Sequence, residues 1–287
     1  MKKIKKIMAG LVATTIVIGG LVGCGNSDSK KTDTAATGSI AEIKSHGTIK
    51  IGVFSDKAPF GYVDSNGKNQ GFDVYIAKRI AKDLLGDETK VEFVLVDAAS
   101  RVAYLESKKV DIIMANFTVT DDRKEKVDFA NPYMNVSLGI VSPDSAKITS
   151  IDQLKGKKVI VAKGTTAETF LTKNYPDLEL VKYEQYSEIF QGLKDKRGDA
   201  IISDNTEVLA WAKENPGYSV GVGELGSSDT IAPAVTKGNT ELRDWINDEL
   251  TTLGKENFVH KAYESTLTSV YGADYEDTLV IEGGKAK

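Results

Sequence analysis

The chain of 287 residues contains one cysteine and two histidines, and this scarcity excludes several kinds of chemistry. With Cys24 alone no internal disulfide can form, so the folded part must be stable without one. His46 and His260 lie far apart, and without further cysteines they form no zinc motif. Neither histidine has a nucleophile at a recognisable spacing. We therefore expect no metal, no cofactor and no enzyme activity.

An excess of charge of one sign is also lacking. The chain has 37 Lys and Arg against 41 Asp and Glu, a net charge of −4, and the two signs are interspersed. A protein that binds nucleic acid usually carries a basic stripe or patch. Nucleic acid is therefore not an expected partner.

The longest apolar run lies at the start of the chain, after a lysine-rich hexapeptide, and extends only from Ile7 to Val22. A membrane-spanning helix needs about 20 apolar residues, so this pattern favours a secretory signal peptide over residues 1–23. The sequence Leu-Val-Gly-Cys that ends at Cys24 resembles the bacterial lipobox. It implies cleavage before Cys24, lipidation of its thiol and a tether to the membrane outside the cytoplasm. An ordinary cleaved signal and an uncleaved anchor are the alternatives.

Residues 24–39 contain almost nothing apolar and are predicted to be a flexible tether. From Ile40 onward, apolar periodicity predicts alternating strands and helices. The expected strands are Thr48–Phe54, Val91–Val96, Val110–Ala115, Lys158–Ala162, Leu180–Tyr183 and Ala200–Ser203. The expected helices are Phe72–Leu85, Ser100–Ser107, Ala167–Asn174 and Tyr186–Lys194. This order indicates an α/β fold with largely parallel sheets.

A repeat divides the folded part into two similar halves. Leu105–Ile113 is echoed by Leu193–Ile201, Asn116–Thr118 falls on Asp204–Thr206, and Gly47–Ile51 resembles Gly156–Ile160. We therefore predict two α/β lobes of similar build. The alternative is an accidental match, because short motifs produce false positives. Asp111 and Asp199, which precede equivalent apolar triplets, are interpreted as structural residues of a turn.

Polar residues follow the last strand of each half. Ligands bind outside the carboxyl ends of strands in open α/β sheets, so Asn116, Thr118 and Asp204 are candidate binding residues. A carboxylate such as Asp204 suits an ammonium group. The alternative is that Asp204 only caps the helix that begins near Asn205.

Two segments of the sequence carry groups that could bind the carboxylate of a ligand. Thr120 is a predicted N-cap, which leaves free backbone N–H groups beside the guanidinium of Arg123. Lys163-Gly164-Thr165-Thr166 opens another helix with a group of donors, but it lacks a P-loop ending. A carboxylate site near an ammonium site predicts a receptor for a zwitterion. The alternatives are plain helix capping and a solvated Arg123.

Two further residues have two interpretations each. Phe60 lies in a loop marked by Pro59 and Gly61, and it either walls a small ligand pocket or packs in the core. Arg101 either reaches the mouth of the same pocket or is a solvated helix residue.

From about Ile43 to Leu279 the chain resembles the bacterial solute-binding proteins of ABC importers, in the family that takes polar amino acids. The motifs that carry the resemblance are Ile51-Gly52-Val53 with Pro59-Phe60, Gly71-Phe72-Asp73-Val74, Thr118–Arg123, Phe129–Tyr133, Gly164-Thr165-Thr166 and Asp199-Ala200-Ile201. It implies a two-lobed, periplasmic-binding-protein-like (type II) fold with two hinge strands. Lobe 1 would then comprise residues 40–137 and 232–287, and lobe 2 residues 138–231.

The resemblance also implies roles for particular residues. Arg123 would bind the ligand α-carboxylate, assisted by Thr118 and Thr166, and Asp204 would bind the α-ammonium with the main chain near Asn116. Segments that include Phe60 and Lys163 look most like the cysteine-binding branch, which makes L-cysteine the first candidate ligand. Acidic-amino-acid binders also carry an arginine like Arg101, so glutamate and aspartate stay as alternatives.

These features together predict a monomeric, extracytoplasmic binding protein. It would capture a free L-amino acid between its lobes and deliver it to a membrane permease and its ATPase subunits. A sensor or adhesin without transport, and a dehydratase-like enzyme on the same scaffold, are the competing hypotheses.

Overall fold

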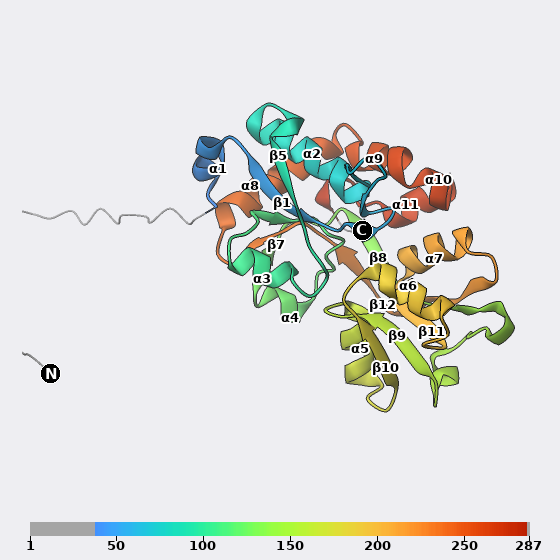
Figure 1. Cartoon of the computed structure of the whole chain (residues 1–287). Helices are drawn as coiled ribbons and strands as arrows, with labels where there is room; N and C mark the ends of the chain where they lie inside the picture. The colour runs from blue at the N-terminus through green and yellow to red at the C-terminus, as the bar shows by residue number, and fades with distance from the viewer. Residues whose placement is uncertain (1–37, 286–287) are drawn as a thin grey trace, which may run out of the picture. The chain divides into compact units, whose positions relative to one another are not determined.

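The computed structural model describes residues 38–285. The expected signal peptide, the lipidated Cys24 and most of the expected tether lie outside this range. The described chain forms two α/β bodies, each built on a five-stranded sheet (Figure 1). Between residues 38 and 285 no helix is long and apolar enough to cross a membrane.

The two large sheets have the same strand order and the same strand directions. Lobe 1 contains the sheet β5 (Val91–Leu95), β1 (Ile49–Val53), β6 (Ile112–Ile113), β13 (Ala234–Thr236) and β7 (Val127–Phe129), in that order. Lobe 2 contains β10 (Glu179–Tyr183), β9 (Lys158–Ala162), β11 (Ala200–Asp204), β8 (Met134–Pro143) and β12 (Tyr218–Ile231). In each sheet the first three strands are parallel and the fourth is antiparallel to both neighbours. The prediction of two similar α/β lobes is confirmed.

The repeat extends to single hydrogen bonds. The carboxylate of Asp111 accepts the backbone N–H of Lys50 at 2.8 Å, and that of Asp199 accepts the N–H of Lys158 at 2.8 Å. Both aspartates therefore tie a turn to the equivalent strand of their own lobe, β1 in lobe 1 and β9 in lobe 2, in agreement with the predicted structural role.

The expected match between the two first strands is wrong by one residue. Ile51 pairs with Ile112, whereas Val159 pairs with Ala200, so Ile51 corresponds to Val159 and not to Ile160. The register of the parallel strand pairs decides which residues correspond, and this register cannot be read from the sequence alone.

Helix α2 (Phe72–Leu85) carries the apolar face that the sequence predicts, with Val74, Ile76 and Ile80 in the lobe 1 core. Its N-cap, Gly71, has φ 115°, and a Cβ there would lie 2.3 Å from the carbonyl oxygen of Phe60. Only glycine fits this position, because both the backbone angle and the space exclude a side chain. The loop before α2 holds a small sheet of β2 (Asp56–Lys57), β3 (Gly61–Val63) and β4 (Asn69–Gln70).

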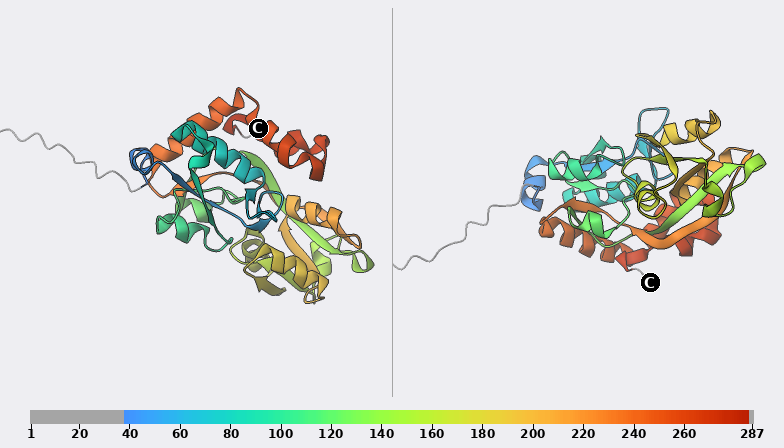
Figure 2. Two further views of the ribbon diagram at one scale, coloured as in Figure 1. Left: turned by 45° about the horizontal axis from the view of Figure 1, so that its top comes forward. Right: turned by 90° about the horizontal axis from the view of Figure 1, so that it is seen from below.

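The C-terminal part of the chain returns to lobe 1. Residues of α8 (Thr240–Gly254) and α9 (Phe258–Thr266) share one apolar core with α2, and these helices lie over the same lobe in two views (Figure 2). The other helices of this lobe are α1 (Ile40–His46), α3 (Arg101–Glu106), α4 (Asp121–Lys124), α10 (Thr268–Tyr271) and α11 (Glu276–Leu279). Short 3-10 helices occur at Glu88–Lys90, Asp144–Ala146, Ile151–Leu154, Ala273–Tyr275 and Glu282–Gly284.

Lobe 2 is covered by α5 (Thr166–Asn174), α6 (Tyr186–Lys194) and α7 (Asn205–Glu214). The bounds of α5 and α6 agree with those expected from the sequence to within one residue. The expected strand Val110–Ala115 is shorter in the structure and keeps only Ile112–Ile113. Asn116 has φ 44°, so the backbone turns out of the extended conformation soon after this strand.

Strands β8 and β12 run from one lobe into the other (Figure 1). The lobes also touch through side chains. The ring of Phe54 meets the ring of Tyr186 edge to face at 5.1 Å, and the hydroxyl of Tyr271 donates to the carbonyl of Thr206 at 2.7 Å. These contacts describe a closed arrangement of the two lobes.

The paired turns provide a test of the repeat. Asp111→Ala and Asp199→Ala should each destabilise the protein by about 1 kcal/mol, because each leaves one strand N–H without its acceptor. The effects should add in the double variant, since the sites lie in different lobes. Urea unfolding measures both. Asp111→Asn and Asp199→Asn keep an acceptor oxygen and serve as controls. An effect in one lobe only would contradict the equivalence.

Candidate functional site

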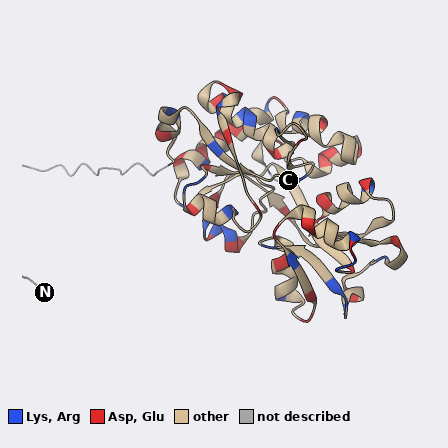
Figure 3. Ribbon diagram, viewed as in Figure 1, with Lys and Arg blue, Asp and Glu red and all other residues tan. Residues whose placement is uncertain are grey.

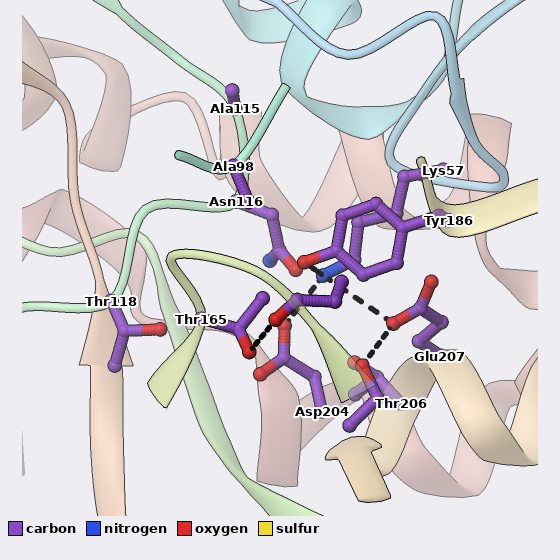
Figure 4. A network of polar contacts seen from close by, with 12 residues as sticks. Lys57, Ala98, Ala115, Asn116, Thr118, Thr165, Tyr186, Asp204, Thr206 and Glu207 are labelled. Carbon is purple, nitrogen blue, oxygen red and sulfur yellow. Dashed lines mark hydrogen bonds and ion pairs between the residues drawn. The ribbon is translucent and has the colours of Figure 1, made fainter. Parts of the chain in front are cut away.

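The carboxyl ends of β6 and β11 meet at the boundary between the lobes. Asn116 follows β6 in lobe 1, and Asp204 ends β11 in lobe 2. The loop after β1 brings Lys57 to the same place, and α6 and α7 contribute Tyr186 and Glu207 (Figure 4). Figure 4 shows these side chains directed toward one another, which makes this boundary the candidate site.

Lys57 is the centre of a buried charge cluster. Its side chain is 0% exposed, and its Nζ lies 2.6 Å from Oδ2 of Asp204, 3.2 Å from the hydroxyl of Tyr186 and 3.6 Å from Oε2 of Glu207. Burial alone would lower the pKa of Lys57, but the carboxylates of Asp204 and Glu207 outweigh it and raise that pKa. Lys57 is therefore a charged ammonium that links the two lobes.

Glu207 is the second carboxylate of the cluster. Its Oε2 accepts the hydroxyl of Ser203, whereas its Oε1 is buried without a hydrogen-bond partner in the described chain. Burial raises the pKa of Glu207 to about 7, against the opposing effect of Lys57. Burial also raises the pKa of Tyr186 to about 12, so this phenol stays protonated near neutral pH.

Arg101 is buried, and its donors are directed at backbone carbonyls. Its guanidinium bonds to the carbonyls of Ala98 (3.0 Å), Ala115 (3.0 Å), Asn116 (3.3 Å) and Gly164 (3.3 Å). Burial lowers its pKa. The interpretation of Arg101 as a solvated helix residue is wrong, because only 2% of it is exposed. It holds strand ends of lobe 1 together and reaches into lobe 2.

Arg123 spans the boundary in the same way. Its guanidinium donates to the carbonyls of Thr118 at 2.7 Å and Gly164 at 3.0 Å, and it lies over the ring of Phe117. Burial and the neighbouring Arg101 lower its pKa. The hydroxyl of Thr120 accepts the N–H of Arg123, which confirms the predicted N-cap.

Gly164 allows the two lobes to approach at the level of the backbone. Its φ is 72°, and a Cβ there would lie 2.5 Å from Cα of Ala99 in lobe 1. A side chain at this position would separate the lobes and move the carbonyl that both arginines contact.

Arg123, Gly164 and Thr166 line a cavity of about 390 Å³ together with Thr120, Leu138 and Leu225. Asp204 and Asn116 do not line this cavity and are buried beyond it. Both polar atoms of the Asn116 side chain and the hydroxyl of Thr206 are buried without a partner in the described chain. Buried polar groups are normally hydrogen-bonded, so these atoms are available to a bound molecule.

The structure thus groups most of the predicted residues and separates two of them. Asn116, Thr118, Asp204, Arg101, Arg123 and Thr166 come together at the lobe boundary. Phe60 is wholly buried in the lobe 1 core, in agreement with the core-packing interpretation. The side chain of Lys163 is partly exposed and pairs with Glu184, away from the charge cluster. The expectation that Asp204 only caps a helix fails, because its side chain makes no cap bond.

Sequence reasoning missed Lys57, Tyr186 and Glu207. Lys57 lies shortly before Pro59 in a segment with loop character, and a lysine in such a segment is ordinarily solvated. Glu207 lies three residues after Asp204, within the first turn of α7, and this spacing is the one signal that points to it.

Comparison with known proteins shows to which family the chain belongs. A family model for bacterial extracellular solute-binding proteins, family 3, matches residues 49–268. The chain belongs to this family. The match covers most of the described chain, including both five-stranded sheets of this solute-binding protein.

Solved structures and curated proteins give more specific similarities. The chain is 54% identical to a solute receptor for L-cysteine from Neisseria gonorrhoeae, with a TM-score of 0.84 over 85% of this chain and 100% of the other. It is 53% identical to a cysteine-binding protein from Campylobacter jejuni, with a TM-score of 0.83 over 85% and 98%. It is 32% identical to a glutamine-binding protein of an ABC transporter from Bacillus subtilis, over 91% of this chain and 96% of the relative. The two-lobed fold of these neighbours agrees with the predicted architecture.

Asp73 of α2 is hydrogen-bonded to Asn116, a residue of the candidate site. Its carboxyl accepts the N–H of Asn116 at 2.7 Å and the hydroxyl of Tyr133 at 2.7 Å, and it is 0% exposed. Burial raises the pKa of Asp73 to about 7. The folded protein therefore holds a proton at this carboxyl at pH values where the unfolded chain has released it.

This linkage predicts a pH effect. Between about pH 4 and 7 the folded state binds the proton more tightly than the unfolded state, so the contribution of Asp73 to stability is full at low pH and falls as pH rises. Asp73→Asn removes this fall, which is on the order of 3 kcal/mol. The measurement is the difference in free energy of unfolding between this solute-binding protein and the variant across that range. A constant difference would contradict the raised pKa.

Proposed function

We propose that this protein is the extracytoplasmic substrate-binding subunit of an ABC importer and that it binds a polar L-amino acid, with L-cysteine as the first candidate. The observation that carries the proposal is the pair formed by Arg123 of lobe 1 and Asp204 of lobe 2 at the lobe boundary of a family 3 chain. A guanidinium and a carboxylate on opposite lobes suit the two charged groups that all free α-amino acids share.

In the proposed complex, Arg123 grips the α-carboxylate from the cavity side. Thr118 and the backbone N–H of Thr166 at the start of α5 complete this half of the site. The α-ammonium binds the carboxylate of Asp204. The Asn116 side chain, buried without a protein partner, accepts or donates the remaining hydrogen bond.

Cysteine is favoured as the ligand by similarity and by the state of Arg101. The two structures at 54% and 53% identity are both described as cysteine receptors or binders. Glutamate and aspartate would need a free cation for the side-chain carboxylate. Arg101 is a poor candidate, because backbone carbonyls of Ala98, Ala115, Asn116 and Gly164 already surround it.

Ligand binding bridges the lobes, and the closed form then docks on a permease that works with ATPase subunits. Closure of this kind is a hinge motion around a fixed site. The glutamine-binding relative from an ABC transporter supports the transport setting.

The ligand is tested by thermal unfolding of residues 25–287 with each L-amino acid and cystine. A ligand that binds only the folded state raises the melting temperature by mass action. We expect cysteine, kept reduced, to give the largest shift. A largest shift with glutamate or aspartate would contradict the cysteine assignment, and the absence of any shift would contradict amino-acid binding.

Arg123→Ala and Asp204→Asn should weaken binding by about 100-fold or more, since each leaves a buried charge unpaired. Lys163→Ala is the matched control and should bind like the wild type.

We further propose that the mature protein is anchored to the membrane by a lipid on Cys24. The support is the short apolar run followed by the lipobox-like sequence that ends at this residue. In a bacterial host grown with labelled palmitate, the full chain should incorporate the label, and Cys24→Ser should incorporate none and leave the membrane fraction. Equal labelling of both proteins would contradict the anchor.

A further inference from the structure

The buried cluster around Lys57 has a consequence for which amino acids fit. We propose that Lys57 and Glu207 together set the charge that the cleft accepts, so that it admits amino acids with uncharged side chains and rejects basic and acidic ones. This inference rests on the proposed function, because it concerns the side-chain half of the same site.

The first step is the position of the pair. Lys57 comes from the loop after β1 in lobe 1, and Glu207 from the first turn of α7 in lobe 2. Their side chains are 0% and 2% exposed, and their charged atoms lie 3.6 Å apart. Water cannot screen charges at this depth, so an unbalanced charge here is costly.

The second step is the balance of charge around the site. Lys57, Arg101 and Arg123 face the carboxyls of Asp204, Glu207 and Asp73. Two more carboxylates lie at the margin. Asp229 faces Arg123 at the cavity, and Asp56 faces Glu207 while accepting the backbone and hydroxyl donors of Ser187. The tyrosines of the cluster are uncharged. The cations of Lys57, Arg101 and Arg123 thus meet the carboxyls of Asp204, Glu207 and Asp73, and a zwitterion with a neutral side chain adds no net charge to this set.

The third step is what a ligand ammonium does to Lys57. At 2.6 Å, Lys57 occupies the side of Asp204 that the ligand ammonium needs. When Asp204 turns to the ligand, the other carboxylate near Lys57 is Glu207 at 3.6 Å, whose Oε1 has no hydrogen-bond partner in the described chain. The neutral pair of Lys57 and Glu207 then offers no free counter-charge, so a basic or an acidic side chain would be buried without a partner.

The experiment measures Kd by isothermal titration at about pH 7.5, which lies above the raised pKa of Glu207 and below that of a free thiol, so cysteine is mostly neutral. The probes are reduced L-cysteine, L-serine and L-glutamine, then L-arginine and L-lysine, then L-glutamate and L-aspartate. Lys57→Met leaves an excess negative charge, and the affinity for arginine relative to cysteine should rise by about 100-fold. Glu207→Gln is isosteric and leaves an excess positive charge, and it should raise the affinity for glutamate relative to cysteine by a similar factor.

The double variant Lys57→Met/Glu207→Gln removes one charge of each sign and should restore the preference for neutral ligands. Lys57→Arg keeps the charge and should keep the wild-type preference. If both single variants weaken all ligands by the same factor, the pair has only a structural role and the inference fails. The Glu207→Gln result decides the matter by itself if Lys57→Met does not fold. If wild type binds none of the probes, the proposed function fails and this inference fails with it.

Discussion

The ion pair between Lys57 and Asp204 joins the two lobes where water does not reach. A buried pair of this kind is stable only when both charges keep their partners, because each ion has lost its hydration. The closed arrangement therefore depends on a complete set of contacts around the pair, including Tyr186 and Glu207. Opening the lobes separates Lys57 from the carboxylates and returns both signs to water.

Two arginines beside the cluster contact backbone oxygens instead of carboxylates. Arg101 and Arg123 of lobe 1 both donate to the carbonyl of Gly164, a lobe 2 residue at the boundary. Carbonyl dipoles partly offset a guanidinium charge without neutralising it, so both side chains keep a net positive charge. Elsewhere the charges are mixed, and Figure 3 shows Lys and Arg interspersed with Asp and Glu on the helices of both lobes.

The parts of this arrangement that follow from local patterns could be predicted from the sequence. The face of α2, the N-cap at Thr120 and the equivalent turns at Asp111 and Asp199 depend on residues close in the chain. The charge cluster could not be predicted, because Lys57 and Asp204 are 147 residues apart. A lysine in a loop becomes a buried cation only through the packing of the opposite lobe. For the same reason the sequence does not reveal that the guanidinium of Arg101 donates to backbone carbonyls.

The contact of Gly164 with Ala99 also determines how a molecule leaves the cleft. Backbone lies against backbone at this point, so the rotation of a side chain at position 164 cannot widen it. Widening the boundary here requires the two lobes to move apart. A membrane partner that holds the lobes apart would release the cargo without competing for any of the groups that bind it.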